Sequence, residues 1–387
     1  MVFAVVALVV GIVLLTWSAE KAVISAEDLS AHLGISPIIV GALIVGLGTS
    51  LPEMVVSGIA AAQRDTIDLA VGNVVGSNAA NLTLVLGVGA IITRISGQRA
   101  VMRREGVMMV AAAALFTAFA IDGYLDEWEG AILLVGMVGA AGVVVNGKGN
   151  GYDAPGAAST TSTDTADSTT DSKSNDNNAD VRTTRRYTAV VATAEVRRSM
   201  FWAIAGLVGV LIGAQLMVTG AVDVAGEFGA SEAFIGLTVV AIGTSLPELA
   251  TTVASARRNS VDLVVGNLIG SNLFNSLAVG GLAGLVGTGI IEESIGPSML
   301  VMLFVSATLI AWGASGRPIT RGIGISLVLI YVVVIILGLY FWRVSSPSAH
   351  RATGSRLHAV PLARLVSVGP PGLRFTSTRG VGRPSLA

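Results

Sequence analysis

Long apolar runs, separated by short polar segments, occupy most of the chain. A helix needs about 20 residues to cross roughly 30 Å of hydrocarbon, and ten runs come close to that length or exceed it. We predict membrane spans near residues 2–18, 36–62, 69–93, 105–121, 128–146, 199–222, 233–256, 263–290, 297–314 and 322–342. The first run has no positive residue before its apolar core and has a counterpart at 199–222, so we predict a span there and not a signal peptide. The pattern predicts an all-α membrane protein.

Two segments do not belong in a bilayer. Residues 147–198 begin with a Gly/Asn run and continue as a Ser/Thr/Asp tract with few apolar residues, too polar to bury a core. We predict a disordered or loosely ordered linker there. The tail, 343–387, is rich in Arg, Pro, Ser and Gly and is predicted to be a basic, disordered segment. The spans then fall into two blocks of five, at 1–146 and 199–342.

The two blocks carry the same polar motifs. Gly-Thr-Ser-Leu-Pro-Glu occupies residues 48–53 and again 243–248, and Gly-Asn-x-x-Gly-Ser-Asn-x-x-Asn occupies 72–81 and again 266–275. The copies lie 195 and 194 residues apart. Because five spans separate them, the second copy enters the membrane from the opposite side. The repeat predicts two inverted five-helix halves in which helices 2, 3, 7 and 8 are broken near the midplane.

Each motif places polar backbone groups at membrane depth. Pro52 has no N–H, so the carbonyl of Gly48 loses its helical donor, and Pro247 has the same effect on Gly243. An unpaired carbonyl in hydrocarbon is costly unless a partner such as a metal cation binds it. The glycine pairs 72/76 and 266/270 are small-xxx-small pairs that let helices approach closely.

Glu53 and Glu248 are the most informative residues of the motifs. A carboxylate at mid-membrane costs at least about 2.5 kcal/mol to insert and defaults to a functional role. No Lys or Arg lies in the same helical stretches to neutralise either of them. Hydroxyl and amide residues recur beside them at helical spacing on shared faces. These are Thr49 with Ser57, Thr244 with Thr252, Asn73 with Ser77 and Asn81, and Asn267 with Ser271 and Asn275.

Oxygen ligands of these kinds suit a hard cation, and Ca²⁺ takes about 6–8 of them. We therefore predict a cation site between the two motifs. For a single Ser, Thr, Gly or Pro, helix packing or a bond to its own backbone is an equally good explanation. Asp68 and Asp262 lie at span ends, where caps or solvated residues are as good an interpretation.

Composition excludes several classes of protein. Hydrophobic residues make up 52% of the chain and charged residues 13%, with a mean hydropathy of +0.75; soluble domains carry about twice that charged fraction. The net charge of −1 gives no basic surface for nucleic acid. The chain has no Cys, and its three His residues lie outside the apolar runs. An intramembrane hydrolase would lack its usual side chains, and we do not expect an enzyme.

Positive residues set the expected orientation. With the N-terminus outside, the cytoplasmic loops and linker hold sixteen Lys and Arg residues and the opposite loops hold Arg64 alone. We therefore predict an outside N-terminus, a cytoplasmic linker and a plasma-membrane location. The seven arginines from Arg343 onward run against this orientation, because ten spans put the C-terminus outside.

The repeated motifs resemble the α-repeats of the calcium:cation antiporter superfamily, which includes sodium/calcium exchangers. The resemblance covers both five-span blocks and implies a ten-helix fold that binds cations at its centre, works as a monomer in the lipid bilayer and needs no organic cofactor. It implies that Glu53 and Glu248 are the principal Ca²⁺ ligands, and that helices 1 and 6 slide as a gate. The other implied oxygen donors are Thr49, Ser50, Ser77, Asn81, Thr244, Ser245, Ser271 and Asn275.

The expected function is exchange of Ca²⁺ for Na⁺ by alternating access, with both ions as transported substrates. Some prokaryotic members of the superfamily have Asp where this chain has Asn275, so the core carries a formal charge of −2 with no third acidic group. That favours Na⁺ over H⁺ as the counter-ion. The alternatives are a Ca²⁺/H⁺ or K⁺-dependent Na⁺/Ca²⁺ exchanger and, less well supported, a cation channel, which usually needs a ring of subunits or a continuous polar lining.

Overall fold

The computed structural model describes residues 2–62, 67–146, 177–227, 241–287, 290–291 and 295–352. Contacts divide the chain into one unit, Met1–Leu339, and a second, Tyr340–Ala387. Of the second unit, residues 340–352 are described, as the end of a helix.

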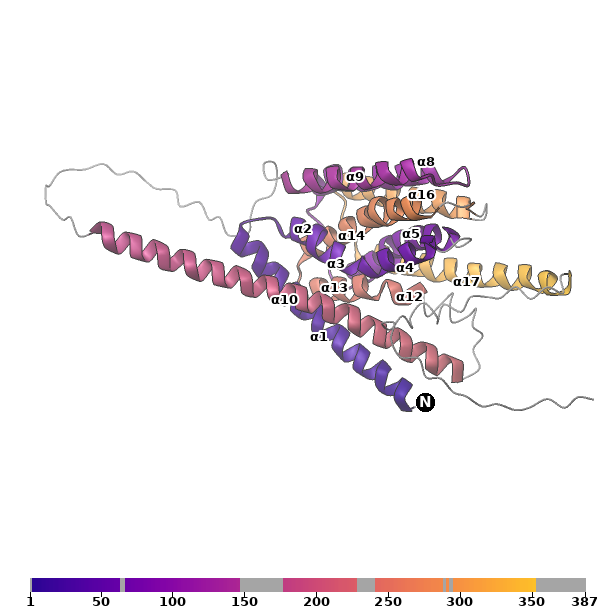
Figure 1. Ribbon diagram of the computed structural model, residues 1–387, viewed down its shortest axis with the longest axis horizontal. Coiled ribbons are helices and arrows are strands. Elements are labelled where there is room, and N and C mark those ends of the chain that lie inside the picture. The colour runs from indigo at the N-terminus through magenta and orange to yellow at the C-terminus, as the bar shows by residue number, and fades with distance from the viewer. Residues whose placement is uncertain are drawn as a thin grey trace, which may run out of the picture. The chain divides into compact units, whose positions relative to one another are not determined.

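Helices form almost all of the described chain (Figure 1). In chain order they are α1 (Val2–Leu33), α2 (Pro37–Val40), η1 (Gly41–Gly46), α3 (Leu47–Thr49), α4 (Leu51–Ala62), α5 (Ile67–Ala80), η2 (Asn81–Val85), α6 (Leu86–Ile92), α7 (Arg99–Val101), η3 (Met102–Gly106), α8 (Val107–Ala120), α9 (Glu127–Asn146), α10 (Asn177–Glu227), α12 (Ala241–Thr244), α13 (Leu246–Arg257), α14 (Val261–Phe274), η5 (Asn275–Val279), α15 (Gly280–Val286), α16 (Ile295–Ala314) and α17 (Arg321–Ala352). The η segments are π-helical. Within the described ranges, two isolated antiparallel pairs join loops, Ile95 with Ile319 and Tyr124 with Ile290.

The all-α class predicted from the apolar runs is confirmed. Among the described residues, six helical stretches are long and apolar enough to cross a membrane, or seven if the bent pair Pro37–Thr49 and Leu51–Ala62 is one span. The six are Val2–Leu33, Ile67–Ile92, Glu127–Asn146, Thr193–Ala225, Val261–Val286 and Ile295–Ala314. Of the other predicted spans, 105–121 is helical in η3 and α8, and 322–342 lies within α17. The span at 233–256 falls partly outside the described residues.

Helix breaks occur at the two prolines but not at the two asparagine motifs. Near Ser50 (φ −85°, ψ 5°), the pair Pro37–Thr49 and Leu51–Ala62 bends by 44°. Ser245 (φ −89°, ψ 3°) separates α12 from α13 in the same way. Predicted breaks in helices 3 and 8 are wrong: Ile67–Ile92 and Val261–Val286 are continuous, each with a π-helical segment in its middle. Neither contains proline, so the backbone adjusts its hydrogen bonds without leaving the helix.

Several helices extend beyond the predicted apolar runs. Helix α1 continues to Leu33, and α10 begins at Asn177, so the last part of the predicted loose linker is helical. The segment 177–205 contains no Gly or Pro, which leaves nothing in the sequence to stop a helix entering from the membrane. Helix α17 likewise runs to Ala352, into the predicted disordered tail. Residues 147–176 and 353–387 lie outside the described residues.

Helices α1 and α10 cross and pack closely over a long stretch (Figure 1). Small residues make this possible, because a Cβ on Gly11 would lie 2.5 Å from the backbone nitrogen of Met217. A Cβ on Gly206 would lie 2.7 Å from the nitrogen of Ala22. Backbone approaches of this kind are typical of helix pairs in membranes.

Helix α14 is the centre of the bundle. All its residues from Leu263 to Phe274 are buried, and it contributes to the two largest apolar clusters. The outer helices show the opposite pattern: Val138 of α9 is 75% exposed and Phe304 of α16 is 72% exposed. Exposed apolar surface on peripheral helices suits lipid contact, so the polar residues of α14 lie away from both lipid and water.

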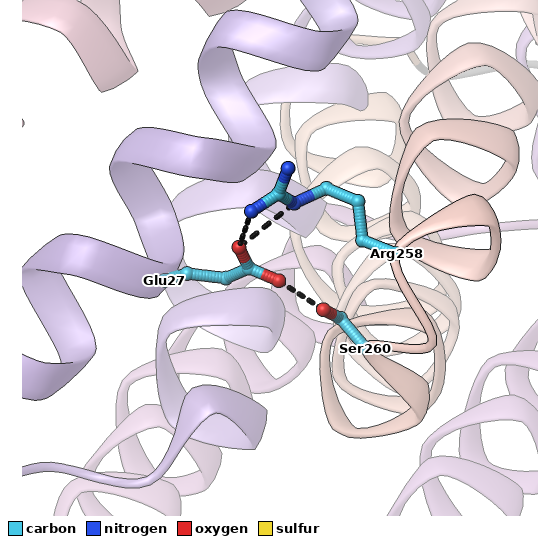
Figure 2. A network of polar contacts seen from close by, with 3 residues as sticks. All are labelled: Glu27, Arg258 and Ser260. Atoms are coloured by element: carbon cyan, nitrogen blue, oxygen red, sulfur yellow. Dashed lines mark hydrogen bonds and ion pairs between the residues drawn. The ribbon is translucent and has the colours of Figure 1, made fainter.

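A polar network ties the end of α1 to the turn between α13 and α14 (Figure 2). The Glu27 Oε2 atom accepts from Arg258 Nε at 2.9 Å and lies 2.7 Å from its Nη2. The Ser260 hydroxyl donates to the other oxygen of Glu27. The hydrogen bond from the guanidinium to Glu27 raises the pKa of Arg258, so the arginine stays charged. In that turn Asn259 has φ 58°, a conformation that asparagine tolerates better than most residues.

We expect Glu27→Gln to lower the free energy of unfolding by about 1 kcal/mol, because a charge-assisted, partly exposed pair is lost. Thermal unfolding of the purified protein in detergent measures this, and high salt should shrink the difference. The control is Glu20→Gln, which removes the same charge from an exposed position of α1. Equal destabilisation by both variants would contradict a specific role for the network.

Candidate cation-binding site

The two acidic residues of the motifs lie in the first turns of the half-helices that follow the breaks. Glu53 lies in the first turn of α4 and Glu248 in the first turn of α13. Each is 1% exposed. A helix N-terminus carries a partial positive charge that favours a carboxylate. The breaks at Ser50 and Ser245 thus create two short helix starts inside the bundle, each with an acidic side chain.

Residues from the two halves of the chain meet directly at these breaks. Ser50 donates its hydroxyl to Glu248 Oε1 at 3.2 Å. Thr49 Oγ1 lies 3.5 Å from Ser271 Oγ, and both hydroxyls donate to the carbonyl of Gly46, at 3.2 and 3.3 Å. The structure therefore brings together predicted site residues that are about 200 positions apart.

The two asparagines at the start of the second motif support the half-helices. Asn73 donates to Ser57 Oγ at 2.9 Å and to the backbone carbonyl of Glu53 at 3.4 Å. Asn267 donates to the hydroxyls of Thr251 and Thr252, at 3.2 and 3.3 Å. These bonds fix the helices that carry Glu53 and Glu248. Thr251 was not predicted, because its counterpart in the first copy is Val56 and no repeat signal marks it.

A further contact joins the two copies of the second motif. Asn78 of α5 donates to Ser276 of η5 at 2.8 Å, and both side chains are buried. Ser276 was also missed by sequence reasoning, because Leu82 occupies the equivalent position in the first copy.

Glycines of α14 set how closely it approaches the helix that contains the first break. A Cβ on Gly270 would lie 2.2 Å from the carbonyl oxygen of Ala42, and one on Gly266 would lie 2.4 Å from that of Ile38. Only glycine allows this backbone contact, which holds Asn267 and Ser271 beside Thr49. The predicted close packing is thus found for this pair. For Gly72 and Gly76, none of the described atoms comes within 4 Å of an added Cβ.

The remaining predicted residues are less directly connected. Gly48 and Gly243 are buried and pack on α10, since added Cβ atoms would lie 2.6 Å from Leu207 Cδ1 and 2.3 Å from Val218 Cγ2. Ser77 is buried in α5, and Thr244 of α12 is half-buried.

Several buried polar atoms have no hydrogen-bond partner among the described residues. Those that belong to predicted site residues are Glu53 Oε2, Glu248 Oε2, Ser245 Oγ and both amide atoms of Asn81 and Asn275. Elsewhere, single side-chain atoms of Ser18, Asn78, Thr117 and Asn272 share this property. A buried polar group without a partner costs about 1–3 kcal/mol, and a charged one more. The set is centred on carboxylate, hydroxyl and amide oxygens, which are hard-cation ligands. A cation held by these atoms would remove the cost that the fold otherwise bears.

The donor set differs from that of a resident transition-metal centre. In the described part of the chain, no group of three or more His, Cys, Asp or Glu side chains is placed to hold a metal ion. Two carboxylates with neutral oxygens suit Ca²⁺ or Na⁺ better than a tightly held metal such as zinc.

Comparisons with known proteins show the family to which the chain belongs. A family model described as sodium/calcium exchanger protein matches residues 3–145 and 198–340. CaxA of Alkalimonas amylolytica is 35% identical over 80% of this chain and 89% of CaxA. The sodium/calcium exchanger MaX1 of Methanosarcina acetivorans is 28% identical over 86% of this chain and 97% of MaX1. A solved structure of the sodium-calcium exchanger NCX_Mj matches with a TM-score of 0.70 at 28% identity, covering 87% of this chain and 99% of that one.

An all-helical membrane bundle with buried acidic residues at helix breaks defines a class of ion-transporting membrane proteins. Within that class, the chain belongs to the sodium/calcium exchanger family, and so to the calcium:cation antiporter superfamily. The resemblance found in the repeated motifs is confirmed.

We expect Gly270→Ala to destabilise the protein by about 1–3 kcal/mol, because the new methyl group would force α14 away from Ala42. Thermal unfolding in detergent measures the loss. The matched control is Gly139→Ala in α9, where an added Cβ meets nothing within 4 Å and helix propensity favours alanine. If the two variants unfold at the same temperature, the result would contradict the close approach of α14 to Ala42.

Proposed function

We propose that this protein is a secondary-active antiporter that exchanges Ca²⁺ for Na⁺, with the cations bound between Glu53 and Glu248. The observation that carries the proposal is the pair of buried carboxylates, each with one unpartnered oxygen, at two helix breaks joined by the Ser50–Glu248 hydrogen bond. Membership of the exchanger family supports cation antiport as the general activity.

We assign the cation ligands by chemistry and position. Glu53 and Glu248 supply the charge, and the neighbouring hydroxyls, amides and carbonyls supply neutral oxygens. The neutral donors are Thr49, Ser50, Ser77, Asn81, Thr244, Ser245, Ser271 and Asn275, with the carbonyls of Gly48 and Gly243. One Ca²⁺ neutralises the two carboxylates, and two or three Na⁺ ions can use the same oxygens in turn. Because one chain holds both carboxylates, the site is complete in a monomer.

Sodium is the preferred counter-ion for a reason of charge. Asn81 and Asn275, which occupy equivalent positions in the two copies, are both neutral amides. The motifs therefore offer no third carboxyl group that could carry a proton through the transport cycle. A glutamate can itself carry a proton, so coupling to H⁺ is the main alternative, and the transport experiment below separates the two.

Two inverted five-helix halves, 1–146 and 199–342, are the architecture that we propose for transport. The repeat offset of 195 residues supports them. Adding 195 to Ile95 gives Ile290, and subtracting 195 from Ile319 gives Tyr124, so the two backbone pairs that join loops exchange with each other. Both family-matched ranges also follow this division.

The close contacts between α1 and α10 obey the same exchange. Gly11 approaches Met217, and Gly206 approaches Ala22; an offset of 195 turns one pair into the other. Two near-equal halves can swap conformations, so inward-open and outward-open states should lie close in energy. The small residues between α1 and α10 suit a helix pair that slides as a gate during alternating access.

We expect an outward Na⁺ gradient, set up by diluting Na⁺-loaded proteoliposomes into Na⁺-free medium, to drive uptake of radioactive Ca²⁺ into the vesicles. Glu53→Gln or Glu248→Gln should reduce uptake to that of protein-free vesicles. This loss of transport should be larger than the about 10–100-fold loss of affinity or activity that follows when a residue supporting a metal ligand is replaced. The matched control is Glu105→Gln, which changes a buried glutamate of η3 that lies 3.7 Å from Arg104 and should retain transport.

Two outcomes of this experiment would contradict the proposal in different ways. Uptake that ignores Na⁺ and follows a pH gradient would assign Ca²⁺/H⁺ exchange and keep the site. Ca²⁺ uptake that survives both glutamine substitutions would contradict the proposal that Glu53 and Glu248 bind the transported cation. Stepwise single-channel currents would assign a channel.

We also expect ten spans with the N-terminus and the Tyr124 turn outside and the Ser96 turn inside. The chain has no Cys, so a single introduced thiol reports one position, and both side chains are exposed. A membrane-impermeant thiol reagent on intact cells should label Tyr124→Cys, and label Ser96→Cys only after permeabilisation. Labelling of both variants in intact cells would contradict this topology and the plasma-membrane orientation.

A further inference from the structure

A cavity of about 270 Å³ lies between two turns, remote in sequence from the acidic site. One turn links α6 to α7, and the other links α16 to α17. The Ile95–Ile319 pair ties them together through backbone hydrogen bonds of 3.2 and 2.9 Å. Both turns contain a glycine with a left-handed backbone, Gly97 (φ 89°) and Gly316 (φ 82°). The walls of the cavity are therefore held by backbone geometry as well as by side chains.

Among the described residues, two arginines are the charged residues that line this cavity, Arg99 and Arg317. Arg99 reaches across to the opposite turn, since a Cβ on Gly316 would lie 3.5 Å from Arg99 Cδ. The guanidinium of Arg317 stacks on the exposed Trp312 ring at 5.0 Å. In the parts of the chain that the structure describes, neither arginine is ion-paired, whereas Arg104 and Arg258 are paired with carboxylates.

Asp262 is an acidic residue that contacts the cavity wall, where it accepts a hydrogen bond from the Gln98 amide. Gln98, not an arginine, thus satisfies that carboxylate. Arg99, Arg317 and Ser96 remain to line a space large enough for a phosphate group, and the Trp312 ring holds the guanidinium of Arg317 from outside the cavity wall. Guanidinium groups match phosphate oxygens with paired hydrogen bonds.

The surroundings favour a lipid as the source of that phosphate. Exposed apolar side chains of α16 and α17 continue from the cavity region along the bundle, including Phe304 (72% exposed) and Leu329 (57% exposed). Ile95, Met102 and Ile319 give the cavity an apolar floor. A head group in the cavity could therefore keep its acyl chains on the lipid-facing surface. The positive-residue pattern predicts that this side faces the cytoplasm, where the leaflet is rich in anionic lipid.

We propose that this cavity binds the phosphate of an anionic phospholipid head group between Arg99 and Arg317. The site is separate from the cation site, and the proposal does not depend on the direction or coupling of transport. Trp312 and the two turns position the guanidinium groups.

Native mass spectrometry of the full chain in neutral detergent, titrated with phosphatidylglycerol, measures binding directly. Each arginine near an anionic lipid surface contributes about five-fold in affinity. The double variant R99Q/R317Q should therefore bind phosphatidylglycerol about 25-fold more weakly than the wild type. The matched control, R94Q/R321Q, removes two exposed arginines from beside the same turns, outside the cavity wall, and should bind like the wild type. Equal loss in both double variants would overturn the site, because it would indicate general electrostatic attraction.

A second variant tests the cavity without changing charge. Ser96→Trp fills the space and should weaken binding as much as loss of the arginines; binding at the wild-type level would place the lipid elsewhere and overturn the proposal. Phosphatidylcholine should bind weakly, and equal binding would remove the anion preference. Displacement of phosphatidylglycerol by millimolar inorganic phosphate would assign the cavity to free phosphate instead of lipid. Thermal unfolding of each variant confirms that it remains folded.

Discussion

In hydrocarbon every backbone N–H and C=O must find a partner inside the protein, and this requirement shapes the whole molecule. Continuous helices meet it automatically, and a break does not. In the described helices the proline-associated breaks lie at Ser50 and Ser245, each two residues before a proline, and buried side chains surround them. Each break also starts a new helix, whose N-terminal turn can stabilise a carboxylate. The costliest backbone feature and the costliest side chains thus occur at one place, where the cation that we propose would offset both costs.

Helix α14 makes that arrangement possible. It is buried from Leu263 to Phe274, and its glycines bring it against the backbone of α2 and η1. Asn267 and Ser271 then face the hydroxyl of Thr49. A larger residue at either glycine would separate these groups by more than a hydrogen bond tolerates. The close packing of α14 at these two glycines is therefore also what places the polar side chains of the candidate site together.

The two halves are related closely but not identically. The loop pairs and the α1–α10 contacts exchange under the repeat offset, whereas the ion pair of Glu27 with Arg258 has no such partner. The position equivalent to Glu27 in α10 is Val222. Likewise Asn78 bonds Ser276, while the equivalent of Ser276 is Leu82. The near-symmetry of the two halves lets each adopt a conformation similar to that of the other. The contacts found in one half alone make the free energies of the two resulting states unequal.

The amino-acid sequence by itself determined the all-α class and the repeated motifs, and it singled out Glu53 and Glu248 as the acidic pair on which the proposed site rests. These features can be predicted from the sequence of a membrane protein, because lipid requires long apolar runs and every charge within them is costly. Tertiary structure alone decided that Ser50 meets Glu248, that α14 packs through Gly266 and Gly270, and that helices 3 and 8 continue through π-helical segments without breaking. Those outcomes depend on contacts between segments about 200 residues apart, and local patterns carry no record of how closely two helices approach.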